Sequence, residues 1–155
     1  MAIDLFLLMR HALEEALKGL NEGEVPVGAV LASGEGKIIA RAHNQPIRLN
    51  DPTGHAEILA MRMAGRLNRN YRLNNTILVV TIEPCVMCMG AALNGRVGRL
   101  VFGAPDPKYG AAGSLFNLAS HSRLNHKIEV TSGIMEEECR ALMKDFFRSR
   151  RANRK

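Results

Sequence analysis

The segment Thr76–Ile82, with sequence TILVVTI, decides the fold, and it runs directly into Glu83-Pro84-Cys85-Val86-Met87-Cys88. Every residue in the segment except one leucine is β-branched, which is typical of a central strand buried on both faces of a sheet. Proline is favoured at the start of a helix, so Pro84 predicts that a helix begins just after the strand. The sequence therefore predicts a buried strand that leads two cysteines to the start of a helix.

Strand and helix patterns alternate on both sides of this segment. Short apolar runs at 25–32 and 37–41, joined by a glycine-rich turn, predict a hairpin, and further strands are predicted at 99–103 and 127–131. Residues 44–54 contain two prolines and are predicted to form a loop. Apolar residues at helical spacing predict three more helices, spanning 5–20, 55–66 (with Ile58, Leu59 and Met61 to Met63 inside) and the C-terminal region, whose buried stripe is Met135, Cys139, Leu142, Met143 and Phe146. This order predicts an α/β sandwich with helices on both faces of one sheet.

Length and composition predict a globular protein of one domain over residues 1–155. Apolar residues make up 46% of the chain and charged residues 23%, which excludes a disordered chain, a collagen-like repeat and a disulfide-stapled miniprotein. The N-terminal ten residues contain Asp4 and lack a basic start, and no apolar run approaches the roughly 18 residues of a membrane span. We therefore expect no targeting segment, no membrane contact and a cytoplasmic location.

The positive charge is concentrated at the C-terminus. The chain has 21 basic and 15 acidic residues, a formal charge of +6, and residues 144–155 carry six basic residues against one acidic residue, a net of +5. One interpretation is a solvated helix end whose cations complement the helix dipole. The other is a surface that contacts the phosphates of a nucleic acid.

Two short segments hold most of the potential metal ligands, His55-Ala56-Glu57 and the Cys85 to Cys88 stretch, each at a predicted helix start. Taken singly, the histidine could be a packed residue and the cysteines a redox pair or small buried hydrophobes. Together, one imidazole and two thiolates match a catalytic zinc site, which uses three protein ligands and keeps a fourth position for water. Cys139 could be a fourth ligand, but its place on an apolar helical stripe favours the core.

Glu57 indicates the reaction. It follows the histidine by two residues, too crowded to ligate the metal but close enough to exchange protons with activated water. The arrangement H-x-E…P-C-x-x-C is the signature of zinc nucleobase deaminases, in which water attacks an amino-bearing ring carbon. A zinc ion used only for folding is the weaker interpretation, because a structural site has four protein ligands.

The flanking residues resemble bacterial tRNA-specific adenosine deaminases of the TadA type, within the cytidine-deaminase superfamily. The resemblance covers 9–151 and includes, besides the zinc motifs, the stretches at 24–30, 44–47, 51–53, 70–73, 101–104, 110–115 and 145–148. It implies a three-layer α/β/α sandwich around a central five-stranded mixed sheet. It also implies a homodimer with one Zn²⁺ per subunit that converts adenosine to inosine at the wobble position of a tRNA anticodon stem-loop.

The resemblance assigns roles to individual residues. It implies that His55, Cys85 and Cys88 bind zinc and that Glu57 transfers protons. The implied substrate-binding residues are Asn44, Val27, Asp106, Lys108, His121, Asn125, Phe147, Arg148, Arg150 and Arg151. Judged without the resemblance, Asn44 is a turn residue, and Asp106 and Lys108 belong to an exposed turn.

Two other functions stay open on the sequence. One is deamination of a free base or nucleoside such as guanine or cytosine, and the other is a zinc-stabilised RNA-binding module without catalysis. The chain departs from the family at Gly54, Ile82 and Met89, none of which is a ligand. Tyr109 lies in the predicted RNA-contacting loop, so it bears on recognition of the substrate rather than on the chemistry.

Overall fold

The predicted central strand lies in the middle of a five-stranded mixed sheet. The computed structural model describes residues 2–153. The strands follow the order β2-β1-β3-β4-β5 across the sheet. Their bounds are Gly28–Ser33 for β1, Ile38–His43 for β2, Thr76–Ile82 for β3, Arg99–Ala104 for β4 and Glu129–Ser132 for β5. Strand β1 is antiparallel to both β2 and β3, whereas β3, β4 and β5 are parallel, so the predicted hairpin and mixed sheet are confirmed.

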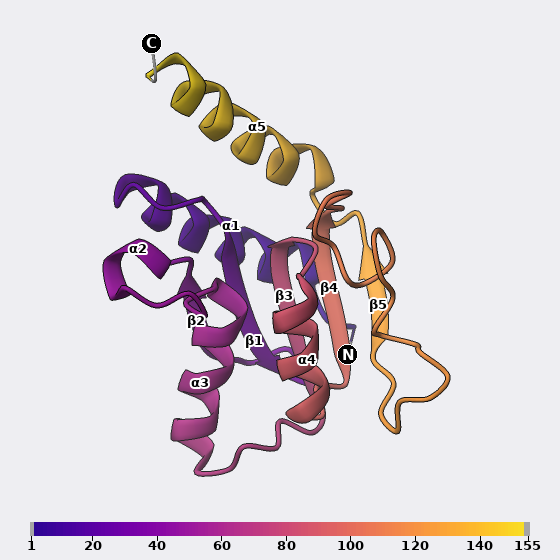
Figure 1. Cartoon of the computed structure of the whole chain (residues 1–155). Coiled ribbons are helices and arrows are strands. Elements are labelled where there is room, and N and C mark those ends of the chain that lie inside the picture. The colour runs from indigo at the N-terminus through magenta and orange to yellow at the C-terminus, as the bar shows by residue number, and fades with distance from the viewer. Residues whose placement is uncertain (1, 154–155) are drawn as a thin grey trace.

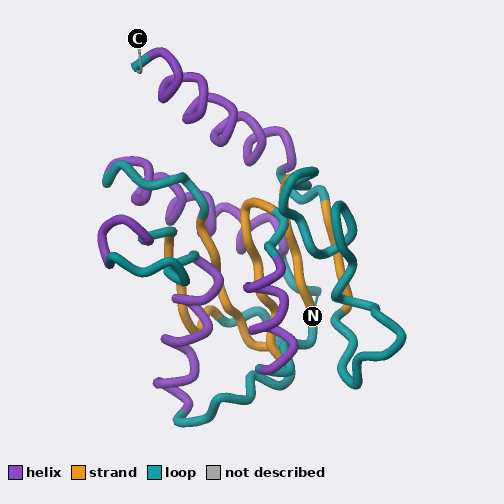
Figure 2. The backbone as a smooth tube through the Cα atoms, viewed as in Figure 1, coloured by secondary structure: helices purple, strands orange, loops and turns teal. Residues whose placement is uncertain are grey.

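Helices cover both faces of the sheet and complete the predicted three-layer α/β/α sandwich (Figures 1 and 2). Helices α1 (Leu5–Asn21) and α5 (Glu136–Ala152) contact one face, and α3 (Ala56–Asn68) contacts the other. Helix α4 (Val86–Asn94) packs beside α3. All seven residues of β3 are buried, as expected for a strand between two layers of helices.

The pleat of β3 divides the core in two. Leu78 and Val80 belong to the cluster beneath α3 and α4, while Ile77 and Val79 belong to the cluster that contains α1 residues and Cys139 of α5. Successive side chains of a strand point to opposite faces, so one short segment supports both layers. The prediction that Cys139 is a core residue is confirmed.

One element was not predicted. Within 44–54, expected to be a loop, Pro46–Leu49 forms the short helix α2. The buried carboxylate of Glu24 accepts hydrogen bonds from the backbone N–H groups of Ile47 (3.2 Å) and Arg48 (2.8 Å). Such N–H groups at a helix start have no partner within the helix, so a remote carboxylate stabilises this turn.

Several boundaries and burial predictions also differ. Strand β1 starts at Gly28 rather than 25, and Met135, Leu142 and Met143 of the predicted buried stripe are only partly buried. Helix α3 continues to Asn68, and β5 starts at Glu129 rather than 127. Met63 is exposed although it was predicted to lie inside, because α3 presents only one face to the sheet. None of the helices within residues 2–153 has the length and apolar character needed to span a membrane.

Candidate metal centre

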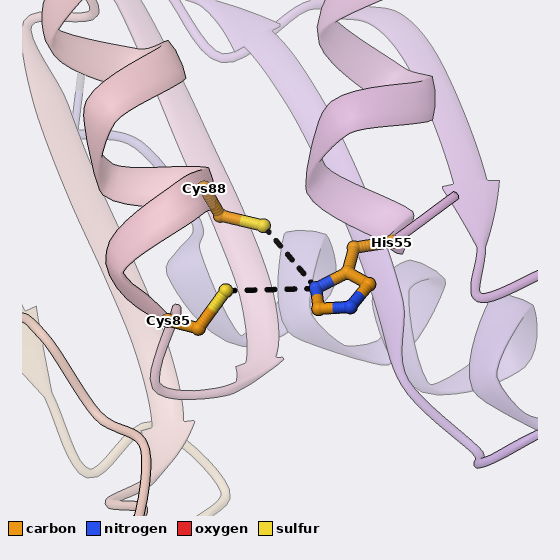
Figure 3. A group of neighbouring side chains, drawn as sticks. All are labelled: His55, Cys85 and Cys88. Atoms are coloured by element: carbon orange, nitrogen blue, oxygen red, sulfur yellow. Dashed lines mark hydrogen bonds between the residues drawn. The ribbon is translucent and has the colours of Figure 1, made fainter. Parts of the chain in front are cut away.

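The three predicted ligands meet where α3 and α4 begin. His55 is the residue that precedes α3, Cys85 precedes α4, and Cys88 lies in the first turn of α4. The Nδ1 atom of His55 lies 3.6 Å from the Sγ atom of Cys85 and 3.5 Å from that of Cys88 (Figure 3). The ligand atoms of all three residues lie within 4.8 Å of one another. The fold thus brings together a histidine and two cysteines that are 30 and 33 residues further along the chain.

These separations fit a tetrahedral zinc ion. Zinc binds histidine nitrogen at about 2.0–2.1 Å and cysteine sulfur at about 2.3 Å, so a tetrahedral angle places nitrogen and sulfur about 3.6 Å apart. The observed 3.5 and 3.6 Å match that value. The donor set also matches, since one imidazole and two thiolates form a catalytic rather than a closed structural zinc site.

The two cysteines differ in acidity. A hydrogen bond with Cys88, together with the contact to His55, lowers the pKa of Cys85 to about 3 despite its partial burial. The same hydrogen bond and burial raise the pKa of Cys88. The sulfur of Cys85 is therefore a thiolate at neutral pH. A thiolate next to an imidazole offers two ligands that a soft divalent cation prefers.

Glu57 lies beside this cluster without belonging to it. It is the second residue of α3 and only 4% exposed, and burial raises the pKa of its carboxyl group. The neighbouring hydrogen-bonding groups are its own backbone N–H and the Cys88 thiol. A buried carboxyl group with a raised pKa next to a metal ligand is suited to take up and release a proton.

Asn44 and Val27 lie together at the start of α3. The side-chain Oδ1 of Asn44 accepts a hydrogen bond from the backbone N–H of Ala56 (3.2 Å), the residue between His55 and Glu57. The backbone N–H of Asn44 donates to the carbonyl of Val27 (3.0 Å). Among residues 2–153, the Nδ2 group of Asn44 has no hydrogen-bond partner, which leaves a donor for a ligand.

The loop with Asp106 and Lys108 is attached to the other side of the centre by Glu83, a residue whose role no sequence motif indicates. Its buried carboxylate accepts hydrogen bonds from the backbone N–H groups of Asp106 (3.1 Å), Ala112 (3.0 Å) and Ser114 (3.0 Å), and from the Ser114 hydroxyl. Glu83 precedes Pro84 and Cys85, so one carboxylate joins this loop to the zinc-binding segment.

Gly110 shows how closely the loop approaches Glu83. A Cβ atom on Gly110 would lie 2.3 Å from Oε2 of Glu83 and 2.6 Å from the carbonyl oxygen of Asp106. No side chain fits there without moving the loop. In the sequence, Gly110 after the turn at Asp106 was the one sign that this loop approaches Glu83 closely.

His121 and Asn125, both predicted to contact the substrate, lie in a segment at the opposite end of the sheet. Nearby, His126 Nε2 contacts the carbonyl of Val97 at 2.7 Å, and Val97 precedes β4. The segment then enters the parallel strand β5 at the end of the sheet remote from Cys85. The structure thus does not bring His121 and Asn125 to the metal centre, because the direction of β5 places its preceding loop elsewhere.

Most of the predicted basic tail forms the last turns of α5. Phe147, Arg148, Arg150 and Arg151 are exposed in its last two turns, and the guanidinium of Arg150 lies 5.2 Å from the ring centre of Phe146. Arg154 and Lys155 lie outside the described residues. Figure 1 shows α5 extending from the end of β5 above the α1 layer, so its cations form a surface separate from the metal ligands.

The chain is similar to known deaminases. Residues 4–104 match the cytidine and deoxycytidylate deaminase zinc-binding region. The chain is 49% identical over 148 residues to a tRNA-specific adenosine deaminase of Haemophilus influenzae, covering 96% of this chain and 86% of that protein. It is 46% identical over 149 residues to a Bacillus subtilis protein of the same name, covering 96% and 92%. A solved structure from a study of A-to-I editing by tRNA:A34 deaminases superposes with a TM-score of 0.84 at 42% identity, covering 88% of this chain and 98% of that one.

Proposed function

The chain belongs to the family of zinc-binding cytidine and deoxycytidylate deaminases, and we propose that it converts adenosine to inosine at the wobble position of a tRNA anticodon. The proposal rests on the geometry of the metal centre taken together with the similarity of the chain to known deaminases. A His-Cys-Cys centre with a buried glutamate beside it occurs in a chain that matches tRNA-specific adenosine deaminases over 96% of its length. The chain is therefore a zinc-dependent hydrolase that acts on the exocyclic amine of adenine.

Its own residues account for the proton transfers. His55, Cys85 and Cys88 would hold the zinc ion, whose Lewis acidity makes water a nucleophile at neutral pH. Glu57 takes one proton from water as the water oxygen bonds to the ring carbon, and delivers that proton to the adjacent ring nitrogen. It then takes the second proton from the new hydroxyl group and delivers it to the amine, which leaves as ammonia when the carbon–nitrogen bond breaks. Burial keeps bulk water from competing for these protons, and the raised pKa of Glu57 lets it act in both directions.

Asn44 and Val27 are proposed to bind the extruded adenosine. The Oδ1 atom of Asn44 is occupied by Ala56, so the free Nδ2 group is the part that donates to the substrate. Val27 packs against both halves of the core and supplies an apolar wall next to Asn44. Both therefore contact the nucleotide from the α3 side of the centre.

Contacts to the rest of the anticodon stem-loop are proposed for two surfaces. Asp106 and Lys108 lie on the loop attached to Glu83, next to the α4 side of the centre. The exposed Phe147, Arg148, Arg150 and Arg151 extend the contact surface along α5. Cationic side chains gain affinity from phosphate groups without reading their sequence, which suits contacts outside the reacting nucleotide.

We further propose that residues 1–155 act as one domain, that two copies form a homodimer and that the protein acts in the cytoplasm, where tRNA is found. Exposed apolar side chains on the α2 and α3 side support the homodimer. Leu49, Met63 and Leu67 line a groove of about 700 Å³ there and are 48%, 43% and 64% exposed to solvent. Apolar groups gathered in this way are typical of protein interfaces.

The function is tested by mapping inosine in tRNA after incubation with the zinc-loaded protein. We expect inosine at the wobble position only, with release of one ammonia per inosine. Release of ammonia from free guanine or cytosine, with none from an anticodon stem-loop, would identify a free-base deaminase instead. Binding of the stem-loop without any inosine would identify a noncatalytic RNA-binding module.

Truncation after Phe147 tests the basic tail. It removes five basic residues, so RNA binding should weaken and depend less on salt, because fewer counterions are released. The slope of log affinity against log salt should fall by about 0.7 to 0.9 for each phosphate that the shortened chain no longer neutralises. Lys37→Gln is the control, because it removes an exposed cation from the turn between β1 and β2, outside the basic tail. An unchanged slope in the truncated chain would assign the tail to a solvated helix end.

A further inference from the structure

The loop attached to Glu83 carries an exposed aromatic side chain. Tyr109 is 67% exposed and lies between Lys108 and Gly110. Two residues further on, the backbone N–H of Ala111 donates to the carbonyl of Pro84 (2.8 Å), the residue before the ligand Cys85. The tyrosine ring is therefore held close in the chain to the α4 side of the metal centre.

The backbone beneath Tyr109 is fixed from several directions. Asp106 stands between Pro105 and Pro107, whose rings restrict the φ angles on both sides of it. Its Oδ1 atom accepts hydrogen bonds from the backbone N–H groups of Lys108 (3.0 Å) and Tyr109 (3.2 Å). Its own N–H donates to Glu83, and its carbonyl accepts from the N–H of Gly110 (2.8 Å). A large ring is thus displayed on a rigid turn, so little entropy is lost when it contacts a ligand.

A displayed ring of this kind matches the chemistry of an unpaired nucleobase. Proteins that bind single-stranded RNA stack bases on aromatic side chains, and any base presents a suitable face. The chain contains no tryptophan, and its exposed aromatic side chains are Tyr71, Tyr109, Phe6, Phe116 and Phe147. Of these, Tyr109 is the one displayed on the turn that Asp106 and Glu83 fix. The other tyrosine, Tyr71, lies beyond the C-terminal end of α3, whose opposite end carries His55.

We propose that Tyr109 stacks on an unpaired base of the substrate RNA loop and thereby sets the affinity for that RNA. The inference rests on the proposed function, since it requires an RNA loop at the metal centre. Glu83 is a positioning residue in this arrangement, because it holds the turn that displays the ring. The phenol hydroxyl has no role in stacking, so the ring alone carries the effect.

Enzyme kinetics on an anticodon stem-loop test the ring directly. Tyr109→Ala should raise KM at least about fivefold and leave kcat within about twofold, because stacking contributes to binding and not to proton transfer. Tyr109→Phe keeps the ring and should restore the original KM. An unchanged KM in Tyr109→Ala, or a loss in Tyr109→Phe equal to that in Tyr109→Ala, would overturn the proposal. The side chain is exposed, so both variants should keep the parent melting temperature and zinc content.

Tyrosine fluorescence supplies an independent measurement. In a Tyr71→Phe chain, Tyr109 is the only tyrosine and no tryptophan interferes. Saturating stem-loop should quench its emission by about half or more, whereas the emission of Tyr71 in a Tyr109→Phe chain should stay unchanged. A fully paired RNA of equal absorbance corrects for absorption by the nucleic acid. Absence of quenching would contradict stacking.

The outcomes separate this inference from the proposed function. If the parent protein forms no inosine in the stem-loop, the proposed function fails. If it forms inosine while KM and emission are insensitive to Tyr109, only the stacking role fails. If the emission of Tyr109 changes with protein concentration before RNA is added, the ring contacts a second copy of the chain, and that result also overturns the proposal.

Discussion

Glu57 and Glu83 are equally buried, each 4% exposed, and each lies two residues from a zinc ligand, yet their surroundings differ. Glu83 accepts four hydrogen bonds, from three backbone N–H groups and one hydroxyl, all belonging to the 106–114 loop. Glu57 faces the Cys88 thiol and its own backbone, and its carboxyl pKa is raised by burial.

This difference separates a structural carboxylate from a reactive one. Both oxygens of Glu83 are engaged by donors that cannot move without the loop, so the side chain has no oxygen free for a substrate. Glu57 has no comparable set of donors and can exchange a proton with a neighbouring group. Burial beside a metal ligand is therefore not sufficient evidence of catalysis, and the hydrogen-bond partners decide the role.

The largest expected effect follows from Glu57→Gln. The amide keeps the shape of the side chain but cannot take up a proton, so kcat should fall about 100- to 10,000-fold. Zinc content, measured by atomic absorption, and affinity for the stem-loop should remain close to those of the parent. Glu83→Gln is the matched control, since it makes the same change at equal burial. If both variants lost turnover to the same extent while folded and loaded with zinc, the two glutamates would not differ as described.

Glu83→Gln should reduce turnover less than Glu57→Gln does, but it should lower the free energy of unfolding more. The new amide group faces N–H donors, so at least one buried donor loses its partner, at a cost of about 1–3 kcal/mol in the free energy of unfolding. The 106–114 loop should loosen, which raises KM for the stem-loop while kcat changes little. Urea unfolding and steady-state kinetics measure the two effects. Glu35→Gln, in the exposed hairpin turn, controls for loss of a carboxylate as such.

The smallest effect is expected from Glu24→Gln. Glu24 is as buried as Glu83 but holds only two N–H groups, both at the start of α2. The free energy of unfolding should fall by about 1 kcal/mol, with kcat within about threefold of the parent, because α2 carries no zinc ligand. Turnover reduced as strongly as in Glu57→Gln would show that the loop before His55 must be fixed for the reaction itself.

The elements that the sequence predicted well are those determined locally. Strand β3 follows from a run of β-branched residues, and α4 begins where expected after that strand, at Val86, two residues beyond Pro84. The structure brings the three predicted zinc ligands, His55, Cys85 and Cys88, together because each lies at or next to a helix start, and their arrangement could hold a metal ion. The match to the zinc-binding deaminase region then confirmed the predicted deaminase family.

The features that the sequence did not predict depend on contacts between distant segments. Helix α2 is stabilised by Glu24, more than twenty residues earlier in the chain, and the loop at Asp106 is fixed by Glu83, which is equally remote. Neither glutamate belongs to a periodic pattern. His121 and Asn125 lie away from the metal centre because of the direction of β5, which local sequence does not determine, and their contact with the substrate RNA stays a prediction.

Helix α5 keeps its surface charge apart from its contacts with the core. Within the described part of the chain, only Cys139 and Phe146 of this helix are buried, and every residue after Phe146 is exposed. The positive charge of the enzyme can therefore be redistributed along the last turns without repacking the core or disturbing the His55 cluster on the opposite layer. We therefore expect libraries restricted to the end of α5 to vary the affinity for RNA while preserving the rate of the chemical step.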